Sequence, residues 1–293
     1  LGGSEVQTVF FGGGTPSLLS PRIIGLTMER ISKYFKLAPK AEVTLEANPE
    51  SLRGGHRAAQ YLDAGINRLS IGVQSMDEGM LRLLGRPHKA QDSLHVAFLA
   101  REAGCANINL DLMWGLPGQS VRQWLQTLKD VIRMAPDHIS AYGLTLEPGT
   151  PIELDVEEGR LTLPPERDQN IMFMEGAAML EQHGYLHYEI SNFARMGFQC
   201  RHNMGYWEGE DYLGIGPSAT STVNNRRWTN PSSQAAWNGR TRECKLGQEV
   251  EELSPETRVL ELLMLRLRTA RGLRIAAYRE MTGRDFVRDH QRL

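Results

Sequence analysis

The sequence lacks the features that mark several large classes of protein. It has three cysteines, Cys105, Cys200 and Cys244, in 293 residues. They are too few and too widely spaced for a disulfide framework, which fits a reducing compartment and predicts a cytoplasmic protein. No apolar run approaches the length of a membrane span, and no signal peptide is visible. The net charge of −2 gives no basic footprint for nucleic acid. We therefore expect no membrane span and no nucleic-acid partner.

The common nucleotide-binding loops are missing as well. An apolar strand at residues 6–11 runs into three glycines at 12–14, and Pro16 then prevents the strand from continuing. A dinucleotide-binding fingerprint would need glycine at position 17, where Ser17 stands, and no G-x-x-x-x-G-K loop follows. Because residues without a Cβ let the backbone approach a ligand closely, this turn is a candidate ligand site of another kind.

The first half of the chain alternates strand and helix signals. The expected helices cover residues 20–34, a stretch that ends at 65, 90–103 and 120–134, between strands at 6–11, 42–46, 68–74, 107–113 and 138–142. Parallel strands joined by helices predict the α/β class and a (βα) barrel or part of one. The chain begins without methionine and almost inside a strand, so we expect a fragment that has lost its N-terminus.

The second half follows a different pattern. Residues 153–160 are acidic and resemble a loop, a helix is expected from Pro164 to about His183, and residues 191–238 carry short strand signals alone. A last helix runs from 254 to 268, with an apolar stripe expected to pack in a core: Val259, Leu262, Leu263 and Leu267.

These changes divide the chain into three expected parts. A partial barrel covers residues 1–150, and a smaller α+β region covers 151–250. A helical segment covers 251–293, and its polar end predicts that the C-terminus is truncated too.

Three neighbouring strands of the predicted barrel carry polar residues on one face. Buried parallel strands are normally apolar on both faces, and barrel interiors are normally filled by branched aliphatic residues. Here Glu46, Gln74 and Asp111 also stand at the carboxyl ends of their strands, as the glycine turn does. Barrel enzymes bind their ligands at this rim, so we expect these residues to converge there.

The residue types at this rim suit a zwitterionic ligand that carries a ribose. Glu46 and carbonyl groups of the turn would hold an ammonium group, and Arg86 would hold a carboxylate through two hydrogen bonds. Gln74 and Asp111 would hydrogen-bond hydroxyl groups. S-adenosylmethionine (SAM) has all three kinds of group; the pattern permits SAM and does not single it out.

Five motifs together resemble a radical-SAM family, the one that contains oxygen-independent coproporphyrinogen III oxidase and the haem chaperone HemW. The resemblance runs through nearly the whole chain, and its motifs are G-G-G-T-P-S at 12–17, L-E-A-N-P at 45–49, N-R-L-S-I-G-V-Q-S at 67–75, G-R-P-H at 85–88 and D-L-M-W-G-L-P-G-Q at 111–119. It implies a three-quarter (βα)6 barrel whose first strand is missing here. It also implies SAM contacts at Gly13, Gly14, Thr15, Glu46, Gln74, Arg86 and Asp111.

The family also carries a C-x-x-x-C-x-x-C loop that holds a four-iron four-sulfur cluster. None of the three cysteines has that spacing. The resemblance therefore implies that the cluster cysteines lie upstream of Leu1 and that the cluster belongs to the full-length protein.

One motif in the second half resembles the H-N-x-x-Y-W motif of the haem chaperones. His202 offers an imidazole as an axial ligand of haem iron, and Tyr206 and Trp207 offer flat faces to a porphyrin. Two alternatives stay open: a loop histidine bonded to the backbone, and Cys200 as a thiolate ligand or a buried structural thiol.

The resemblance implies a haem chaperone that binds haem or porphyrin and passes haem to an acceptor protein that the sequence does not name. The alternative is an enzyme, oxygen-independent coproporphyrinogen III oxidase, which decarboxylates propionate side chains by radical chemistry. A third possibility is a SAM-binding barrel with an unrelated radical reaction. The intact His202 motif favours the chaperone, and we assign no catalytic residue, since no nucleophile elbow or Ser/His/Asp set is found.

Overall fold

The computed structural model describes residues 5–54, 56–243, 245, 248–289 and 291. Cys244 lies outside these residues. The chain forms two compact units, residues 1–202 and 203–293, each described here by itself. The division expected near residues 150 and 250 stays a prediction.

The first unit is built on a seven-stranded sheet in the order β1-β2-β3-β4-β5-β7-β6. Its strands are β1 (Glu5–Phe11), β2 (Lys36–Ala47), β3 (Arg68–Gln74), β4 (Ile108–Trp114), β5 (His138–Gly143), β6 (Leu186–Glu189) and β7 (Asn192–Ala194). Neighbours from β1 to β5 pair in parallel, whereas β7 pairs antiparallel with both β5 and β6. This curled half-barrel of the α/β class confirms the predicted fold.

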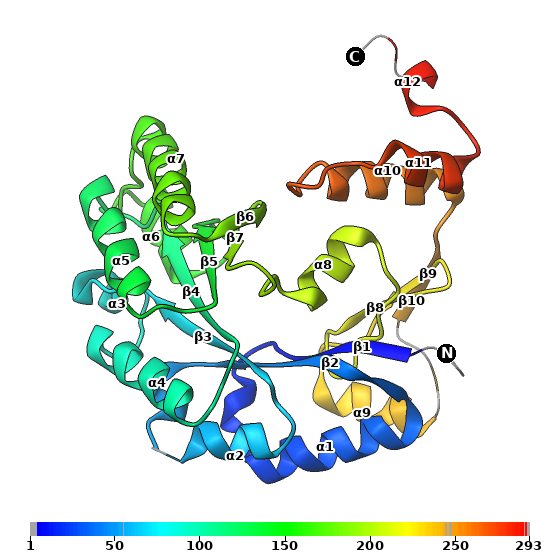
Figure 1. The fold of residues 1–293 in the computed structure, drawn as a ribbon, viewed down its shortest axis with the longest axis horizontal. Helices are drawn as coiled ribbons and strands as arrows, with labels where there is room; N and C mark the ends of the chain where they lie inside the picture. The colour runs from blue at the N-terminus through cyan, green and yellow to red at the C-terminus, as the bar shows by residue number, and fades with distance from the viewer. Residues whose placement is uncertain (1–4, 55, 244, 246–247, 290, 292–293) are drawn as a thin grey trace. The chain divides into compact units, whose positions relative to one another are not determined.

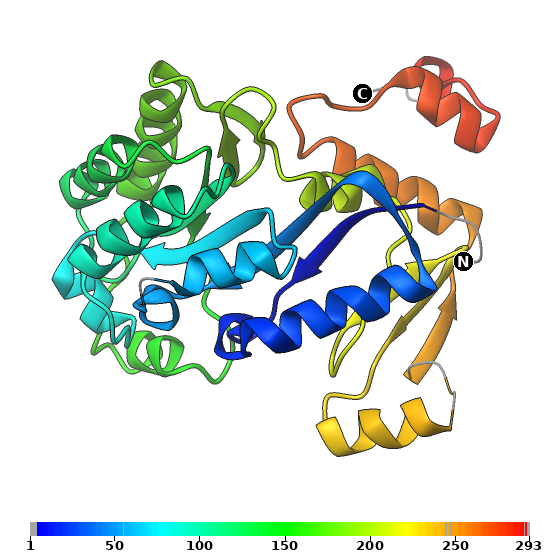
Figure 2. The same cartoon turned by 60° about the horizontal axis from the view of Figure 1, so that its bottom comes forward.

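Helices cover the outer side of this sheet. They are α1 (Pro21–Tyr34), α2 (Arg57–Asp63), α3 (Glu78–Leu83), α4 (Ala90–Glu102), α5 (Val121–Arg133), α6 (Pro151–Glu157) and α7 (Glu166–Gln182), with short 3₁₀ helices at Pro16–Leu18 and Pro49–Leu52. Figure 1 shows α1, α2 and α4 along the outer side of β1–β3. Figure 2 shows α1 lengthwise beside β1 and β2.

Strand alternation decides which face of the sheet packs against the helices. Leu45, Ile71 and Leu110 are fully buried with the helix residues Ile24 and Trp124 in one core. The alternate positions on the same strands are the polar ones, such as Ser70 and Asn109. The apolar face is therefore covered by helices, and the polar face points to the inside of the curl.

The second unit contains a three-stranded antiparallel sheet and several helices. Its elements are β8 (Thr220–Val223), β9 (Arg226–Thr229), α9 (Gln234–Arg242), β10 (Gln248–Glu252), α10 (Pro255–Arg266), α11 (Ile275–Thr282) and α12 (Phe286–Asp289), with sheet order β10-β9-β8. The β8–β9 hairpin turns at Asn224 and Asn225, both at positive φ. Arg227 on β9 donates to both carboxylate oxygens of Glu261 on α10, at 2.6 and 3.0 Å.

Three details of the sequence interpretation were wrong. Residues 153–157 are helical and not a loop, because α6 (Pro151–Glu157) begins at the Thr150 cap, whereas residues 158–160 form a turn after it. The stretch 191–238 contains a helix, α8 (Arg201–Glu208), and the start of α9, besides its short strands. Leu267 does not pack in a core: it is 72% exposed, although Leu262 of the same stripe is 4% exposed.

No helix among the residues that the structure describes is long and apolar enough to cross a membrane.

Candidate functional site

The glycine turn directly follows β1 at the carboxyl end of the sheet. A Cβ on Gly12 would lie 2.6 Å from the Phe10 ring and 3.3 Å from the Glu46 carboxyl carbon, so only glycine fits there. Gly13 and Gly14 have φ values of +80° and +54°, and no atom lies within 4 Å of a Cβ added to either. The turn is therefore an open backbone cradle, as a close-binding ligand requires.

Glu46, at the end of β2, faces this cradle. Its carboxylate accepts a hydrogen bond from the Gly13 N–H at 3.2 Å. Burial, and then the charge of Asp111, raise the pKa of Glu46, and the Gly13 bond and Arg68 offset part of the increase. Two carboxylates that influence each other in this way form an electronegative site, which suits a cationic group.

Gln74 ends β3 in a strained conformation beside the same cradle. Its φ is +66°, which non-glycine residues rarely adopt. A Cβ on Gly72 would lie 2.9 Å from both Gln74 Nε2 and Asn48 Oδ1, so these two amides meet over Gly72. Asn48 also donates to Thr15 Oγ1 at 3.2 Å. Asn48, which the sequence interpretation did not select, thus bonds to Thr15 and lies with Gln74 beside Gly72.

Asp111 lies on the inner face of β4 with both oxygens engaged. Asn109 Nδ2 donates to Asp111 Oδ1 at 2.8 Å, and Ser70 Oγ donates to Oδ2 at 2.9 Å. Glu46 and Gln74 lie at the carboxyl ends of β2 and β3, beside the turn that holds Gly13, Gly14 and Thr15. Asp111 lies in the middle of β4 and not at its end as predicted, because β4 continues to Trp114, but its side chain is on the same polar side of the sheet. The structure brings these six predicted residues together.

Arg86 is the predicted SAM residue that the structure does not connect to the others. It follows α3, half-buried, and no interaction among the described residues joins its guanidinium to Glu46 or Asp111. His88 ties this segment to the rim, since its ring nitrogens lie 3.2 Å from Glu50 Oε2 and 3.2 Å from the Val73 carbonyl. His88 thus holds the Arg86 segment beside the end of β3.

Arg68, a buried charged residue at the start of β3 inside the curl, was not selected from the sequence. Arg68 is 2% exposed, and its Nε has no hydrogen-bond partner among the described residues. Burial lowers the pKa of Arg68, but the nearby Cys200, Glu42, Tyr188 and Asp111 outweigh this and raise it. The sequence does contain a signal for this residue: Arg68 is a charged residue at the first position of a strand that is otherwise predicted to be buried.

His202 is not in an exposed loop but on the first turn of α8, half-buried against β1. Its Nδ1 lies 2.8 Å from Thr8 Oγ1, and its ring stacks on Phe10 with centroids 4.8 Å apart. Burial lowers the pKa of His202, with Glu42 raising it and Arg68 lowering it further. The imidazole is therefore neutral at pH 7, the form that binds a metal.

The start of α8 is fixed by a carboxylate from a distant strand. Glu42 on β2 accepts the backbone N–H groups of Arg201 at 3.0 Å and His202 at 3.1 Å. Cys200 is fully buried, with its Sγ 3.5 Å from Glu42 Oε1. Cys200 is thus a buried thiol, the structural alternative that the sequence left open.

Tyr206 and Trp207 follow on the same helix, within the second unit. Tyr206 is 40% exposed, and its ring meets Tyr212 edge to face at 4.7 Å.

The described residues contain no group of three or more His, Cys, Asp or Glu side chains placed to hold a metal ion. A cluster ligand set is therefore not formed by this part of the chain.

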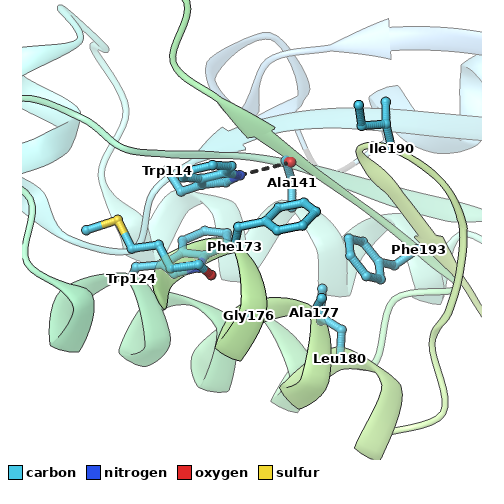
Figure 3. A pocket seen from close by; sticks show the side chains of 10 residues that line it. Trp114, Trp124, Ala141, Phe173, Gly176, Ala177, Leu180, Ile190 and Phe193 are labelled. Atoms are coloured by element: carbon cyan, nitrogen blue, oxygen red, sulfur yellow. Dashed lines mark hydrogen bonds between the residues drawn. The ribbon is translucent and has the colours of Figure 1, made fainter. Parts of the chain in front are cut away.

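A small cavity lies behind the sheet, between α5 and α7. Figure 3 shows it among Trp114, Trp124, Phe173 and Phe193, with Trp114 Nε1 donating to the Ala141 carbonyl at 3.2 Å. Its volume is about 10 Å³, enough for one water molecule and far too small for SAM or haem. The cavity is a packing feature and not a second ligand site.

The chain is similar to known radical-SAM proteins. Residues 2–131 match the Radical SAM superfamily model, and residues 253–293 match the HemN C-terminal domain. The "Heme chaperone HemW" of Bacillus subtilis is 34% identical over 287 residues, which cover 97% of this chain and 76% of that protein. The chain belongs to the HemW family. HemW of Escherichia coli is 42% identical over 222 residues, 75% of this chain and 57% of the relative.

Other relatives extend the comparison. The mitochondrial "Radical S-adenosyl methionine domain-containing protein 1" of Danio rerio is 44% identical over 216 residues, 74% of this chain. This HemW-family chain spans about half the length of that curated relative, 48%. The solved structure of coproporphyrinogen III oxidase (HemN) from Escherichia coli matches 97% of the chain and 68% of its own, at 23% identity and a TM-score of 0.81. At that identity it supports the fold alone.

Proposed function

We propose that this chain is part of a haem chaperone that binds haem and passes it to an acceptor protein. The intact His202 motif carries the proposal: the HemW relatives bear the name of haem chaperones, and His202 presents a neutral, half-buried imidazole on an ordered helix. His202 is the proposed iron ligand, with Tyr206 and Trp207 as porphyrin contacts.

SAM is the ligand proposed for the rim of the sheet. The Glu46 carboxylate would pair with the SAM ammonium group beside Gly13, Gly14 and Thr15, and Asp111 and Gln74 would accept or donate hydrogen bonds at the ribose. Arg86, on the segment that His88 holds beside the end of β3, would hold the SAM carboxylate. The open cradle and the carboxylate pair support this assignment.

A four-iron four-sulfur cluster is proposed for the full-length protein, held by upstream cysteines. Together with SAM it supplies the radical chemistry for which the superfamily is named. A chain extended to include those cysteines and reconstituted without oxygen should show iron–sulfur absorbance. If it shows none, the cluster proposal fails.

The site of action is proposed to be the cytoplasm. The acceptor is proposed to be a protein, with no nucleic acid involved. The small net charge of −2 is consistent with a partner other than nucleic acid.

The alternative function is oxygen-independent coproporphyrinogen III oxidase, favoured by the fold shared with HemN. A radical-SAM reaction of another kind is the third possibility. One pair of assays on the reconstituted, extended protein separates these functions. A chaperone, once loaded with haem, should transfer it to apomyoglobin as a model acceptor and should leave coproporphyrinogen unchanged. Decarboxylation of coproporphyrinogen would favour the oxidase, and failure to transfer haem would contradict the chaperone.

A further inference from the structure

A continuous chain of hydrogen bonds crosses the inside of the first unit. It begins at the Cys200 N–H, just before α8, which lies 3.2 Å from the Tyr188 hydroxyl. Tyr188 Oη lies 2.7 Å from His138 Nε2, and His138 Nδ1 lies 2.6 Å from Asn109 Oδ1. Asn109 Nδ2 then reaches Asp111 Oδ1 at 2.8 Å. The chain therefore connects the base of the His202 helix with the carboxylate proposed to hold the SAM ribose.

One assignment of protons satisfies every bond in this chain. Burial, and then the charge of Arg68, keep the pKa of His138 well below its ordinary value, so its ring is neutral at pH 7. Asn109 uses its NH₂ group toward Asp111 and Ser70, at 2.8 and 2.7 Å, so its oxygen must accept from His138 Nδ1–H. His138 Nε2 is then the acceptor of the Tyr188 O–H, and the Tyr188 oxygen accepts the Cys200 N–H.

All four donors therefore point the same way, from α8 toward Asp111. Hydrogen bonds aligned in series polarise one another, and more so where water is excluded. Exposure is 0% for His138, 1% for Asn109 and 7% for Tyr188. A ligand that donates to Asp111 would compete with the Asn109 donor, and this series of bonds leads from there to the backbone just before His202.

The geometry points to Tyr188 and His138 as positioning residues shared by two sites, through which SAM bound at Asp111 alters the affinity of the His202 helix for haem. This inference rests on the proposed function, because it needs both ligands. By linkage, haem must change SAM affinity by the same factor.

The test is the haemin dissociation constant with and without saturating SAM. In the wild-type chain we expect SAM to change this constant about fivefold or more. Tyr188→Phe keeps the ring but removes both bonds of the hydroxyl, so the ratio should fall to within about twofold of unity. Tyr185→Phe is the matched control, because Tyr185 is also buried but its hydroxyl donates to the Pro136 carbonyl and takes no part in this series of hydrogen bonds. It should keep the wild-type ratio.

A second variant tests the same coupling independently, in case Tyr188→Phe does not fold. His138→Gln removes the imidazole that joins Asn109 to Tyr188 and should abolish the coupling in the same way. Circular dichroism checks the fold of each variant. Equal ratios in wild type, Tyr188→Phe and Tyr185→Phe would overturn the inference, as would a wild-type ratio of one. In those outcomes both ligands still bind and the proposed function stands, whereas the absence of SAM or haemin binding would contradict the proposed function as well.

Discussion

Glu46 shows how a single carboxylate can be prepared for a cation. Its pKa is raised above the ordinary value of 4.5, chiefly by burial. The fold therefore favours the protonated form, so this contribution to the stability of the ligand-free chain is present below pH 4.5 and is lost as the pH rises through the raised pKa. A bound ammonium group would reverse that preference, because it pairs with the ionised form.

SAM affinity should accordingly increase with pH through the raised pKa of Glu46 and then level off. Glu46→Gln should weaken binding roughly 10-fold to 100-fold, since a charge-assisted hydrogen bond is worth about 1.5–3 kcal/mol, and should remove that pH step. Titration calorimetry between pH 4.5 and 8 measures both effects. Glu29→Gln, at an exposed glutamate of α1, should change neither. A flat pH profile in the wild type would contradict the assignment.

Gln74 stores backbone strain at the same rim. Its φ of +66° costs a non-glycine residue on the order of 1 kcal/mol, so Gln74→Gly should raise the free energy of unfolding by about 0.5–1 kcal/mol while weakening SAM binding. Ala135→Gly is the control, because Ala135 has a φ of +49° in the turn before β5. It should stabilise the chain similarly and leave SAM affinity unchanged. Urea denaturation and calorimetry measure the two quantities, and a Gln74→Gly variant that binds SAM normally would remove Gln74 from the site.

At the scale of elements, the residues that cap each helix start explain why some helices were predicted from the sequence and one was not. The starts of α1, α5 and α10 are capped by Ser20, Ser120 and Ser254, each directly before the helix, and all three helices were predicted. The start of α8 is held by Glu42, 159 positions away along the chain from Arg201, so no local signal announces it. α6 did have a local signal at Thr150 and Pro151, but its acidic composition was taken for a loop.

The Glu42 contact gives a prediction for α8. Glu42→Gln removes the charge that faces two helix N–H groups, and should lower the free energy of unfolding by about 1–2 kcal/mol and weaken haemin binding, because His202 lies on that turn. Ser254→Ala removes the cap of α10, where Ser254 accepts from Thr257 N–H, and should destabilise by a similar amount without affecting haemin. Thermal unfolding and haemin titration distinguish these results. Loss of haemin affinity in both variants would point to general destabilisation.

For the whole molecule, sequence periodicity predicted the half-barrel and the convergence of Glu46, Gln74 and Asp111 with the glycine turn. Both follow from the parallel pairing of β1 to β5, which places the carboxyl ends of these strands at one rim, although Asp111 lies in the middle of β4. The interior contacts could not be predicted in the same way. His138, Tyr188 and Asn109 come from three strands and meet only through the register of the sheet, and single residues in a sequence do not reveal that register.

The proposed haem site rests on both the similarity to HemW relatives and the position of His202 on α8. Titration of the protein with haemin tests it most directly. Wild-type protein should develop a Soret band on adding haemin. His202→Ala should shift or abolish that band and weaken binding at least about tenfold, since the proposed iron–nitrogen bond is lost while the porphyrin contacts proposed for Tyr206 and Trp207 stay. Cys200→Ala should keep the wild-type spectrum, as should His95→Ala at an exposed histidine of α4. Circular dichroism must show each variant folded, because His202 packs on Phe10 and Thr8. An unchanged spectrum and affinity in folded His202→Ala would contradict the account.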